Sequence, residues 1–398
     1  MTGRDGAARR PRLMLVVTSA VTVETFLPGL VRRLARSGWD VTIACSPAPD
    51  GAVPSVPGAQ VIGVGMRRDP SPVADLRAAR GLWSAMRATE PDVVATATPK
   101  AGLLGTLVAR GRRVPVVVHL MWGLRSETLA GRRGRLVRLL EGVATRYSHA
   151  VVPNSASLAT ELSRLGMVDP RTVTVIGSGS SHGVDLARFR PAGEGAPAPP
   201  AVVSGLAELG AGPVVGFVGR LTADKGITTL LDAVRLLRGR GQNVRLLLVG
   251  AAEDLAVTDR IAVERAAGLP VLVVDRVTDT APLYQVMDVH CLPSLREGFP
   301  NVCLEASACA VPTVTTDATG AVDSVLDGHT GRIVGRGDPD ALADALGPLL
   351  DNPQLRARMG RAARDWVEQE FGAELVERRH VEYLAGLLGA PVGAEVTS

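Results

Sequence analysis

The sequence predicts an α/β protein built from two successive doubly wound, Rossmann-like domains. Short runs of β-branched and aliphatic residues alternate with helix-forming stretches of similar or greater length, which is typical of a parallel sheet. The alternation stops in a segment rich in Pro, Ala and Gly at residues 191–212 and then restarts. At 398 residues the chain is long enough for two domains of ordinary size. We expect the domains to face each other across a cleft, a favoured place for ligands.

The elements follow this alternation in order. We expect a flexible basic tail at 1–11, a first domain at 12–190, a linker at 191–212, a second domain at 213–372, and a final helical segment at 373–398. Strands of the first domain are predicted at 13–17, 41–45, 60–64, 92–96, 114–119, 150–153 and 172–176. Strands of the second are predicted at 213–218, 244–249, 270–274, 289–293 and 313–316. Helices are predicted to connect the strands.

Composition excludes several classes of protein. Aromatic residues make up only 3% of the chain, which argues against a base-stacking surface for nucleic acid. The four cysteines show no CxxC spacing, so we expect neither a metal site nor a disulfide framework. No apolar run reaches the ~18 residues of a membrane span, and the basic start lacks an export cleavage site. A cytoplasmic protein without a metal or cofactor is expected.

Two cations open the second domain. A predicted strand ends at Gly219, Arg220 follows it, and Lys225 lies five residues later at the start of a helix. An arginine can bind a diphosphate bidentately, and a lysine adds a point charge. The chain has 44 Lys and Arg residues but only two lysines, Lys100 and Lys225. This loop therefore predicts phosphate binding, without the GxxxxGK[ST] pattern of a P-loop.

A second stretch combines carboxylates with a helix start. Glu297 follows a buried strand, Gly298 makes a turn, Pro300 is expected at the first helical position, and Glu305 lies further along the helix. Carboxylates can accept hydrogen bonds from sugar hydroxyls, and the amide donors at the helix start can take a phosphate. The stretch therefore predicts a site that binds sugar hydroxyls and phosphate.

The first domain carries polar residues where its strands end. Thr18, Ser19, Lys100 and His119 are expected at these carboxyl ends, where parallel sheets bind ligands. A basic amphipathic helix from Arg132 to Arg146 can lie on an anionic membrane surface or be an ordinary surface helix. A glycine-rich run at 177–183 nearly matches a dinucleotide fingerprint, but its sixth position is His182.

These motifs together resemble the retaining glycosyltransferases of family 4. The carrying residues are Gly219-Arg220-Leu221 with Lys225-Gly226, then Glu297-Gly298-Phe299-Pro300 with Glu305 in Glu-x7-Glu spacing. Further similarity lies at 98–102, 183–189 and 327–331, and the resemblance runs from about residue 12 to 385. It implies a GT-B fold, with the donor bound mainly by the second domain and the last helix crossing back to the first.

The resemblance also implies roles for residues. Arg220 and Lys225 would neutralise the donor diphosphate, Glu305 would hold the ribose, and Glu297 would face the transferred sugar. Gly219 and residues 298–302 would complete the donor site, and His119 would lie near the reacting centre. The acceptor would meet the Thr18, Ser19, Lys100, Trp122 and Arg125 side chains. Two departures are the loop at 18–22, which replaces a glycine-rich loop, and His182, where asparagine is expected.

The expected reaction is hexosyl transfer, with retention and without metal, from a nucleotide-sugar to a hydroxyl. UDP is the expected nucleotide, and the acceptor is a lipid-linked saccharide or a soluble natural product, as in surface polysaccharide or natural-product biosynthesis. Stabilisation of the leaving diphosphate by cations would supply much of the catalysis. The alternatives are a GT-B nucleotide-sugar 2-epimerase, a Rossmann dehydrogenase and a non-catalytic membrane-surface adaptor. Peripheral contact with the inner membrane surface would use the Arg132–Arg146 helix.

Overall fold

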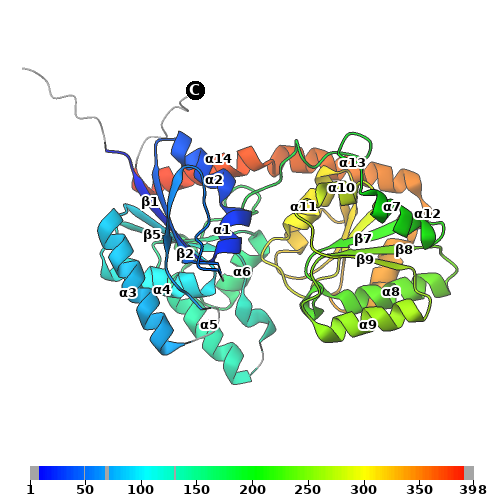
Figure 1. Ribbon diagram of the computed structural model, residues 1–398, viewed down its shortest axis with the longest axis horizontal. Helices are drawn as coiled ribbons and strands as arrows, with labels where there is room; N and C mark the ends of the chain where they lie inside the picture. The colour runs from blue at the N-terminus through cyan, green and yellow to red at the C-terminus, as the bar shows by residue number, and fades with distance from the viewer. Residues whose placement is uncertain (1–8, 49, 68–70, 130, 390–398) are drawn as a thin grey trace, which may run out of the picture. The chain divides into compact units, whose positions relative to one another are not determined.

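The structure, a computed structural model, describes residues 9–48, 50–67, 71–129 and 131–389. Most of the expected basic tail, residues 1–8, lies outside the described residues, as does the end of the chain from 390 to 398. The chain divides into two compact α/β units. Unit 1 runs to Asn154 and takes in Leu158–Gly177 and the segment from Glu374; unit 2 comprises Ser155–Ser157 and Ser178–Ala373. The prediction of two successive doubly wound, Rossmann-like units is thus confirmed (Figure 1).

Unit 1 has, in its described residues, a parallel sheet of six strands in the order β3-β2-β1-β4-β5-β6. The strands are β1 (Arg12–Ser19), β2 (Asp40–Ser46), β3 (Ala59–Gly63), β4 (Val93–Ala97), β5 (Val116–Met121) and β6 (Ala150–Pro153). The direction of strand addition reverses between β1 and β4, so the loops that follow these two strands diverge. The expected strand at 172–176 forms only a single bridge, between Val173 and Val151.

Alternation along β1 divides the core of unit 1 between the two faces of its sheet. Leu13 and Leu15 pack with α1 (Ala20–Phe26), α2 (Pro28–Arg36) and α14 (Ala373–Leu388). Met14 and Val16 point to the other face and pack with α3 (Pro72–Thr89) and α4 (Pro99–Gly111). This period of two is that of a strand buried on both faces. Helices α5 (Gly131–Arg146) and α6 (Ala156–Arg164) and the short turns η1 (Arg125–Thr128) and η2 (Pro170–Thr172) complete the described elements.

Unit 2 repeats the same plan, with the strand order β12-β11-β10-β7-β8-β9 in its described residues. Its strands are β7 (Val214–Val218), β8 (Arg245–Val249), β9 (Val271–Val274), β10 (Val289–Leu292), β11 (Thr313–Thr316) and β12 (Gly331–Val334). All the described pairings are parallel, and β7 lies beside β10 through Val215 and Val289. Here the order reverses between β7 and β10, which makes the carboxyl ends of these two strands the expected ligand position.

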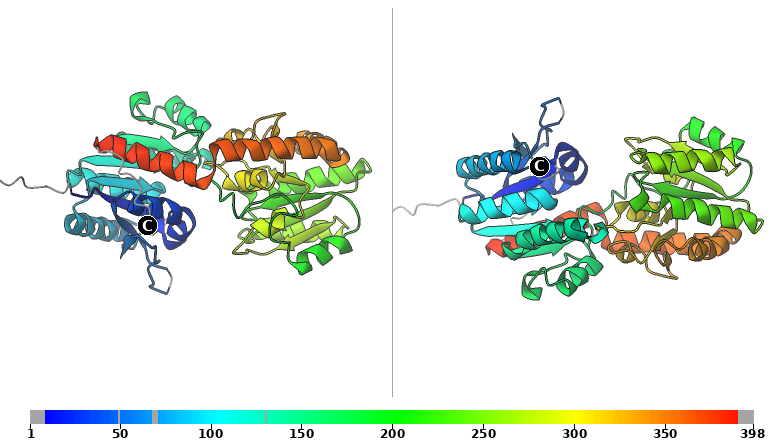
Figure 2. Two further views of the ribbon diagram at one scale, coloured as in Figure 1. Left: turned by 90° about the horizontal axis from the view of Figure 1, so that it is seen from above. Right: turned by 90° about the horizontal axis from the view of Figure 1, so that it is seen from below.

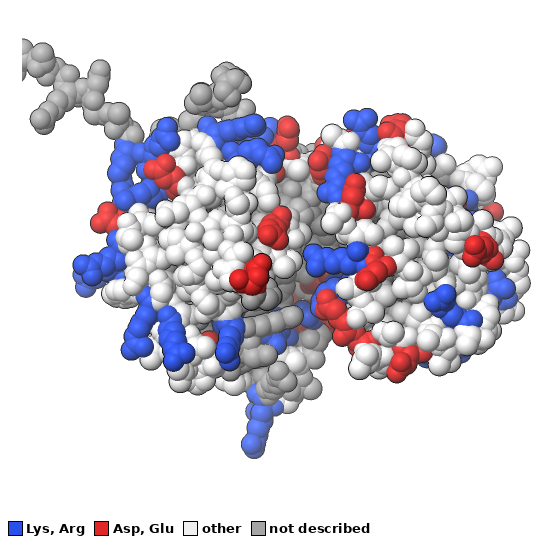
Figure 3. All heavy atoms as spheres, in the orientation of Figure 1, with Lys and Arg blue, Asp and Glu red and all other residues white. Residues whose placement is uncertain are grey.

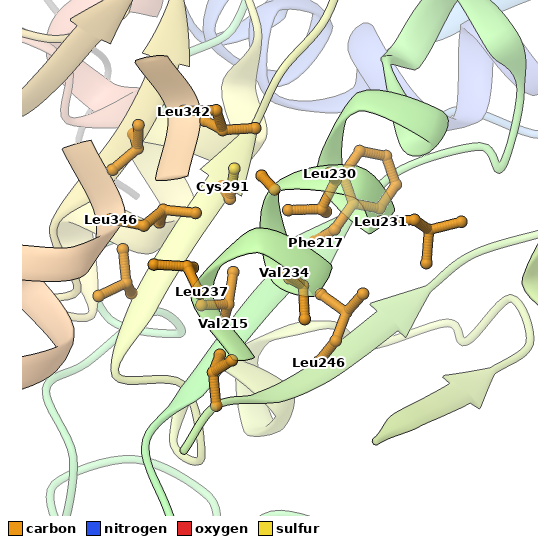
Figure 4. Close-up of a cluster of buried hydrophobic side chains, with 14 of the residues drawn as sticks. Val215, Phe217, Leu230, Leu231, Val234, Leu237, Leu246, Cys291, Leu342 and Leu346 are labelled. Atoms are coloured by element: carbon orange, nitrogen blue, oxygen red, sulfur yellow. The ribbon is translucent and has the colours of Figure 1, made fainter. Parts of the chain in front are cut away.

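Helices cover both faces of the unit 2 sheet (Figure 2). Phe217 points to the face covered by α8 (Ile227–Gly239), α9 (Leu255–Ala266) and α12 (Pro339–Asp351). Figure 4 shows Leu230 and Leu231 of α8 beside its ring, with Leu342 and Leu346 of α12 in the same cluster further along the sheet. Val214 and Val218 point to the face covered by α7 (Pro200–Glu208), α10 (Ala281–Tyr284), α11 (Asn301–Ala308) and part of α13 (Pro353–Glu370). Short turns are η3 (Ala223–Lys225) and η4 (Val322–Ser324).

The segment expected to be a linker, residues 191–212, differs from that expectation. It contains α7, which Pro199 precedes as the N-cap residue and Pro200 opens. Val202 and Leu206, four residues apart on one helical face, are buried in the core of unit 2. The unit boundary lies near residue 177 instead. At the other end of the chain, α14 contributes Val381 and Leu384 to the core of unit 1.

Candidate active site

The loops after β7 and β10 meet at the carboxyl edge of the unit 2 sheet. Gly226 precedes α8 with φ of +73°, and a Cβ there would collide with the backbone carbonyl oxygen of Pro293, the residue after β10. Glycine is the residue that accepts both the left-handed backbone and this close approach. The backbone N–H of Leu295 donates to the carbonyl of Asp224 at 2.9 Å, which joins the two loops. The cation-bearing loop and the carboxylate-bearing loop are therefore adjacent.

Lys225 and Glu297 form an ion pair between these loops. Lys225 Nζ lies 2.5 Å from Glu297 Oε1, and the two side chains are 17% and 11% exposed. The Ser294 hydroxyl donates to the same carboxylate oxygen at 2.7 Å. In turn, the backbone N–H of Glu297 donates to the Thr319 carbonyl at 3.1 Å. The pair fixes one cation and one carboxylate at the point where the strand order reverses.

Arg220 is the more exposed of the two predicted cations. Its side chain is 43% exposed, and its guanidinium lies 3.1 Å from Glu253 and 4.0 Å from Asp224. Asp224 accepts from the Thr222 hydroxyl at 2.6 Å and lies 3.4 Å from Arg296. Burial raises the pKa of Asp224, but the Thr222 hydroxyl and the nearby cations outweigh it, so the net pKa lies below the ordinary value. A diphosphate near Arg220 would compete with these exposed partners for its guanidinium.

Glu305 lies in α11 in a different electrostatic environment. Its Oε2 accepts from the Tyr284 hydroxyl at 2.9 Å and from the Thr280 hydroxyl at 3.2 Å. Burial raises the pKa of Glu305 to about 7, and the two hydroxyl donors oppose that rise. Tyr284 and Thr280 were absent from the sequence prediction, because no motif marks them and only the fold brings α10 against α11. The carboxyl of Glu305 is therefore held by neutral donors.

The start of α11 is anchored by its neighbours. Pro300 is the N-cap residue, so helix α11 begins one residue later than predicted, at Asn301. The Asn301 amide donates to the Gly183 carbonyl at 2.7 Å, lies 2.8 Å from His182 Nε2, and accepts from the Ser180 hydroxyl at 3.1 Å. His182 thus takes part in holding α11, although sequence similarity led us to expect asparagine there.

The loop between Glu297 and α11 is closely packed. Gly320 has φ of +77°, and a Cβ there would collide with the carbonyl of Gly298. Phe299 is buried, with its ring centroid 5.4 Å from that of Phe371. Gly219 follows β7 with φ of +152°, and a Cβ on Gly250 would collide with its carbonyl. Val302 is half-buried in α11 and packs against the unit 2 core.

In unit 1 the expected acceptor residues gather where β1 and β4 end. Thr18 Oγ1 lies 2.6 Å from Thr98 Oγ1, and Ser19 caps α1 by accepting from the Thr22 N–H at 3.3 Å. Thr98 has φ of +72°, a strained value for a β-branched residue. Lys100, near the start of α4, is ion-paired with Asp75 at 2.7 Å. These residues lie at the reversal of strand order in unit 1.

Trp122 and Arg125 follow β5. The Trp122 ring stacks on Phe26 with centroids 5.3 Å apart, so it bridges the loop after β5 to α1. The Arg125 backbone N–H donates to the buried carboxylate of Glu141 at 2.8 Å. Trp122 and Arg125 therefore have defined positions, on the segment between β5 and α5.

His119 does not lie at the end of its strand as predicted. Strand β5 continues for two residues to Met121, and His119 is only 3% exposed. Its Nδ1 is hydrogen-bonded to Thr96 Oγ1 at 2.9 Å, and a Cβ on Gly102 of α4 would collide with its ring. Burial lowers the pKa of His119 to about 4. The alternation of β5 directs this side chain under α4, so its environment is that of a neutral core histidine.

Two further features bear on cofactors and membranes. Among the described residues, no three His, Cys, Asp or Glu side chains come together as ligands for a metal ion. No helix in the described ranges has both the length and the apolar character needed to cross a membrane.

Comparison with known proteins identifies the family. Residues 22–179 match the glycosyl transferase 4-like domain, and residues 212–352 match the glycosyl transferases group 1. The capsular polysaccharide biosynthesis glycosyltransferase CapM of Staphylococcus aureus is 31% identical over 365 residues, covering 89% of this chain and 93% of CapM. The D-inositol 3-phosphate glycosyltransferase of Kribbella flavida is 31% identical, covering 89% and 88%.

Solved structures share the fold. Sucrose-phosphate synthase from Thermosynechococcus elongatus superposes with a TM-score of 0.82 at 20% identity, covering 96% of this chain and 100% of that one. Anabaena HepE, solved in complex with UDP-glucose, gives a TM-score of 0.74 at 20% identity, covering 94% and 99%. Neither the 2-epimerase nor the dehydrogenase alternative gains support from these comparisons. The chain belongs to the family 4 glycosyltransferases of GT-B fold and is a glycosyltransferase.

Proposed function

We propose that this glycosyltransferase transfers a sugar from a UDP-sugar to a saccharide hydroxyl, with retention at the anomeric carbon and without a metal. The Lys225–Glu297 pair, where the strand order of unit 2 reverses, carries the proposal. Arg220 and Lys225 supply cations for the diphosphate, and Glu305 supplies a carboxyl for hydroxyls. One structural relative, Anabaena HepE, solved with UDP and with UDP-glucose, supports the choice of nucleotide.

The chemistry follows from charge. Breaking the bond between the anomeric carbon and the phosphate oxygen develops negative charge on the leaving diphosphate. The cations of Arg220 and Lys225 stabilise that charge, and the amides at the start of α11 add to the positive potential. Because two cations already serve the leaving group, a divalent metal is not required in this proposal. The buried His119 is left without a catalytic role, since its ring is enclosed in unit 1.

We propose that the acceptor hydroxyl attacks the anomeric carbon from the same face from which the diphosphate departs, so that the configuration is retained. A double displacement would need a free carboxylate nucleophile. Glu297 Oε1 already accepts from Lys225 and Ser294, which makes this carboxylate a poor nucleophile. The leaving phosphate then accepts the proton of the acceptor hydroxyl as the new bond forms. Isolation of a covalent glycosyl adduct on Glu297 would overturn this route.

The acceptor is proposed to bind unit 1 near Thr18, Ser19 and Lys100. The polar rim where β1 and β4 end, with its strained Thr98, supports this assignment. The similarity to CapM, whose name places it in capsular polysaccharide biosynthesis, favours a lipid-linked saccharide over a soluble natural product. The protein would then work in the cytoplasm at the inner membrane surface.

The test is a titration of UDP-, GDP- and ADP-sugars, followed by transfer assays with lipid-linked and soluble acceptors in the presence of EDTA. The expected results are tightest binding of a UDP-sugar, EDTA-resistant transfer, and a product with the anomeric configuration of the donor by NMR. Tighter binding of another nucleotide, loss of transfer with EDTA, or an inverted product would each refute one part of the proposal. Conversion of donor without acceptor would support an epimerase instead.

A peripheral membrane contact is proposed for α5. Leu136 and Leu139 are 53% and 64% exposed on this helix, and Arg135 and Arg138 beside them are also exposed. Lys and Arg side chains gather along the edge of unit 1 that α3 and α5 form (Figure 3). An apolar pair flanked by cations suits an anionic lipid surface, where each nearby cation contributes about 1 kcal/mol.

Vesicle sedimentation tests this contact. The chain should bind phosphatidylglycerol vesicles, and Leu136→Glu with Leu139→Glu should reduce binding at least tenfold. Leu255→Glu, on the 83% exposed leucine of α9 in unit 2, is the matched control and should bind as wild type. Equal binding by both variants would refute the role of α5.

A further inference from the structure

A groove on the outer side of α13 has the features of a second ligand site. It has a volume of about 560 Å³ and lies between α13 and the segment that follows η4. The α13 residues that line it fall on one face of the helix, and Leu326 and His329 come from the loop before β12. This volume is within the range of about 300–1,000 Å³ that small-molecule sites occupy.

The polar side chains in the groove have no partner in the described part of the chain. Arg358, Arg361, Asp365 and Gln369 line the groove, and none of them makes a hydrogen bond or an ion pair with another described residue. Their arginine neighbours on the same helix differ. Arg356 donates to the Leu349 and Leu350 carbonyls, and Arg364 donates to the Phe189 carbonyl at 2.8 Å. The groups without a protein partner thus lie on the face of α13 that lines the groove, where they are exposed and accessible to a ligand.

An aromatic ring in the groove is held rigidly. Trp366 lines it, and its indole meets the fully buried ring of Phe371 edge to face, with centroids 4.9 Å apart and planes at 80°. A half-buried tryptophan locked by a core residue presents a flat apolar surface at little entropic cost. The indole N–H also lacks an acceptor among the described residues. Flat aromatic surface ringed by planar polar groups is suited to a sugar ring, whose face is apolar and whose edge carries hydroxyls.

The net charge of the groove lining indicates which class of saccharide it can bind. The two guanidinium groups and one carboxylate of the lining leave one positive charge in excess. A guanidinium binds a carboxylate or a phosphate bidentately. Carboxylate and amide groups, here Asp365 and Gln369, suit the hydroxyls of a neutral ring. The groove therefore fits a saccharide that carries an acidic group.

We propose that this groove binds an acidic oligosaccharide, apart from the loops after β7 and β10 where donor binding is proposed. The ring of one sugar packs on Trp366, and its acidic substituent or that of its neighbour pairs with Arg358 and Arg361. The proposal needs only the saccharide-handling character of the family and does not depend on the identity of the donor. Its test is a binding measurement in the absence of transfer.

Calorimetric titration of the full chain with three probes separates the contribution of the sugar ring from that of the acidic group. The probes are a hyaluronate tetrasaccharide, which alternates uronic acid and N-acetylhexosamine, a neutral chitin tetrasaccharide of the same length, and an oligoglutamate with the same number of carboxylates. We expect saturable binding of the hyaluronate fragment, at least tenfold weaker binding of the other two, and no displacement by saturating UDP.

Variants locate the binding. Arg358→Gln with Arg361→Gln should weaken binding of the acidic fragment at least tenfold, and Trp366→Ala should do the same in a chain that circular dichroism shows to be folded. Arg265→Gln, an exposed arginine of α9 without a partner among the described residues, is the matched control and should bind as wild type. The absence of saturable binding, equal binding of oligoglutamate, displacement by UDP, or binding unchanged in the arginine double variant would each overturn the proposal.

Discussion

Removal of either partner of the Lys225–Glu297 pair should destabilise unit 2 by about 2–3 kcal/mol. Loss of one member of a buried pair costs about 3–5 kcal/mol, because the other charge stays buried without compensation. Here the side chains are 17% and 11% exposed, so water can partly solvate the remaining charge and the expected loss falls slightly below that range. The Ser294 hydroxyl continues to donate to Glu297 when Lys225 is changed, which limits the loss further.

A double-mutant cycle isolates the pair. Lys225→Met keeps the aliphatic stem without the charge, and Glu297→Gln keeps the shape without the charge. Each single change should lower the free energy of unfolding by about 2–3 kcal/mol, and the double variant should recover roughly 2 kcal/mol of their sum. Urea unfolding followed by circular dichroism measures the three variants, with the transition of each unit fitted separately.

The matched control is an exposed pair of the same unit. Arg240 lies 2.7 Å from Asp344, but the side chains are 43% and 69% exposed. The same cycle with Arg240→Met and Asp344→Asn should give a coupling below about 1 kcal/mol, because water screens both charges. Additive effects at Lys225 and Glu297, within about 0.5 kcal/mol, would refute the reasoning that burial makes this pair cooperative.

Three further outcomes follow from neighbouring features. Gly226→Ala should lower the free energy of unfolding by about 2–4 kcal/mol, because its Cβ meets a backbone carbonyl, while Gly241→Ala, with φ of +85° and open space, should cost about 1 kcal/mol by urea unfolding. The raised pKa of Glu305 means that the folded state binds more protons than the unfolded state between pH 4.5 and 7, so stability should fall as pH rises through that window, by at most roughly 3 kcal/mol. Glu305→Gln should flatten that fall, and an unchanged pH profile would contradict it. Glu141→Ala should destabilise unit 1 by about 2–3 kcal/mol, because two backbone N–H groups lose their acceptor. Glu141→Gln should recover only about half of that loss in thermal unfolding, because its carboxamide has one accepting oxygen for the two donors.

The fold was largely predictable because its strands are buried on both faces. Runs such as Leu13 to Val17 mark such strands without knowledge of their partners. The linker prediction was wrong because α7 has only two buried apolar residues, Val202 and Leu206, within a Pro- and Ala-rich stretch. The Pro- and Ala-rich composition favoured a linker more strongly than two apolar residues favoured a helix. In the structure, packing of these two residues against the unit 2 core stabilises the helix.

The candidate site was predictable where its residues lie on the two loops themselves. Arg220, Lys225 and Glu297 follow strands whose carboxyl ends share one edge of a parallel sheet, and the observed strand order makes β7 and β10 neighbours at that edge. Tyr284 could not be found this way, because its contact with Glu305 depends on how α10 packs against α11. His119 was misplaced for a related reason: a two-residue extension of β5 converts a strand end into a core position.

The two glutamates in Glu-x7-Glu spacing are made chemically different by what surrounds them. Glu297 lies against the Lys225 ammonium, so its charge is compensated and it orders a cation at the edge of the sheet. Glu305 has two hydroxyl donors and no cation within ion-pairing distance among the described residues, and burial raises its pKa to about 7. Near neutral pH its carboxyl can therefore donate as well as accept, which suits a pair of adjacent hydroxyls better than a carboxylate that only accepts. One spacing motif thus yields a charge-compensated carboxylate and a carboxyl held by neutral donors, because an ammonium neighbours Glu297 and a phenol neighbours Glu305.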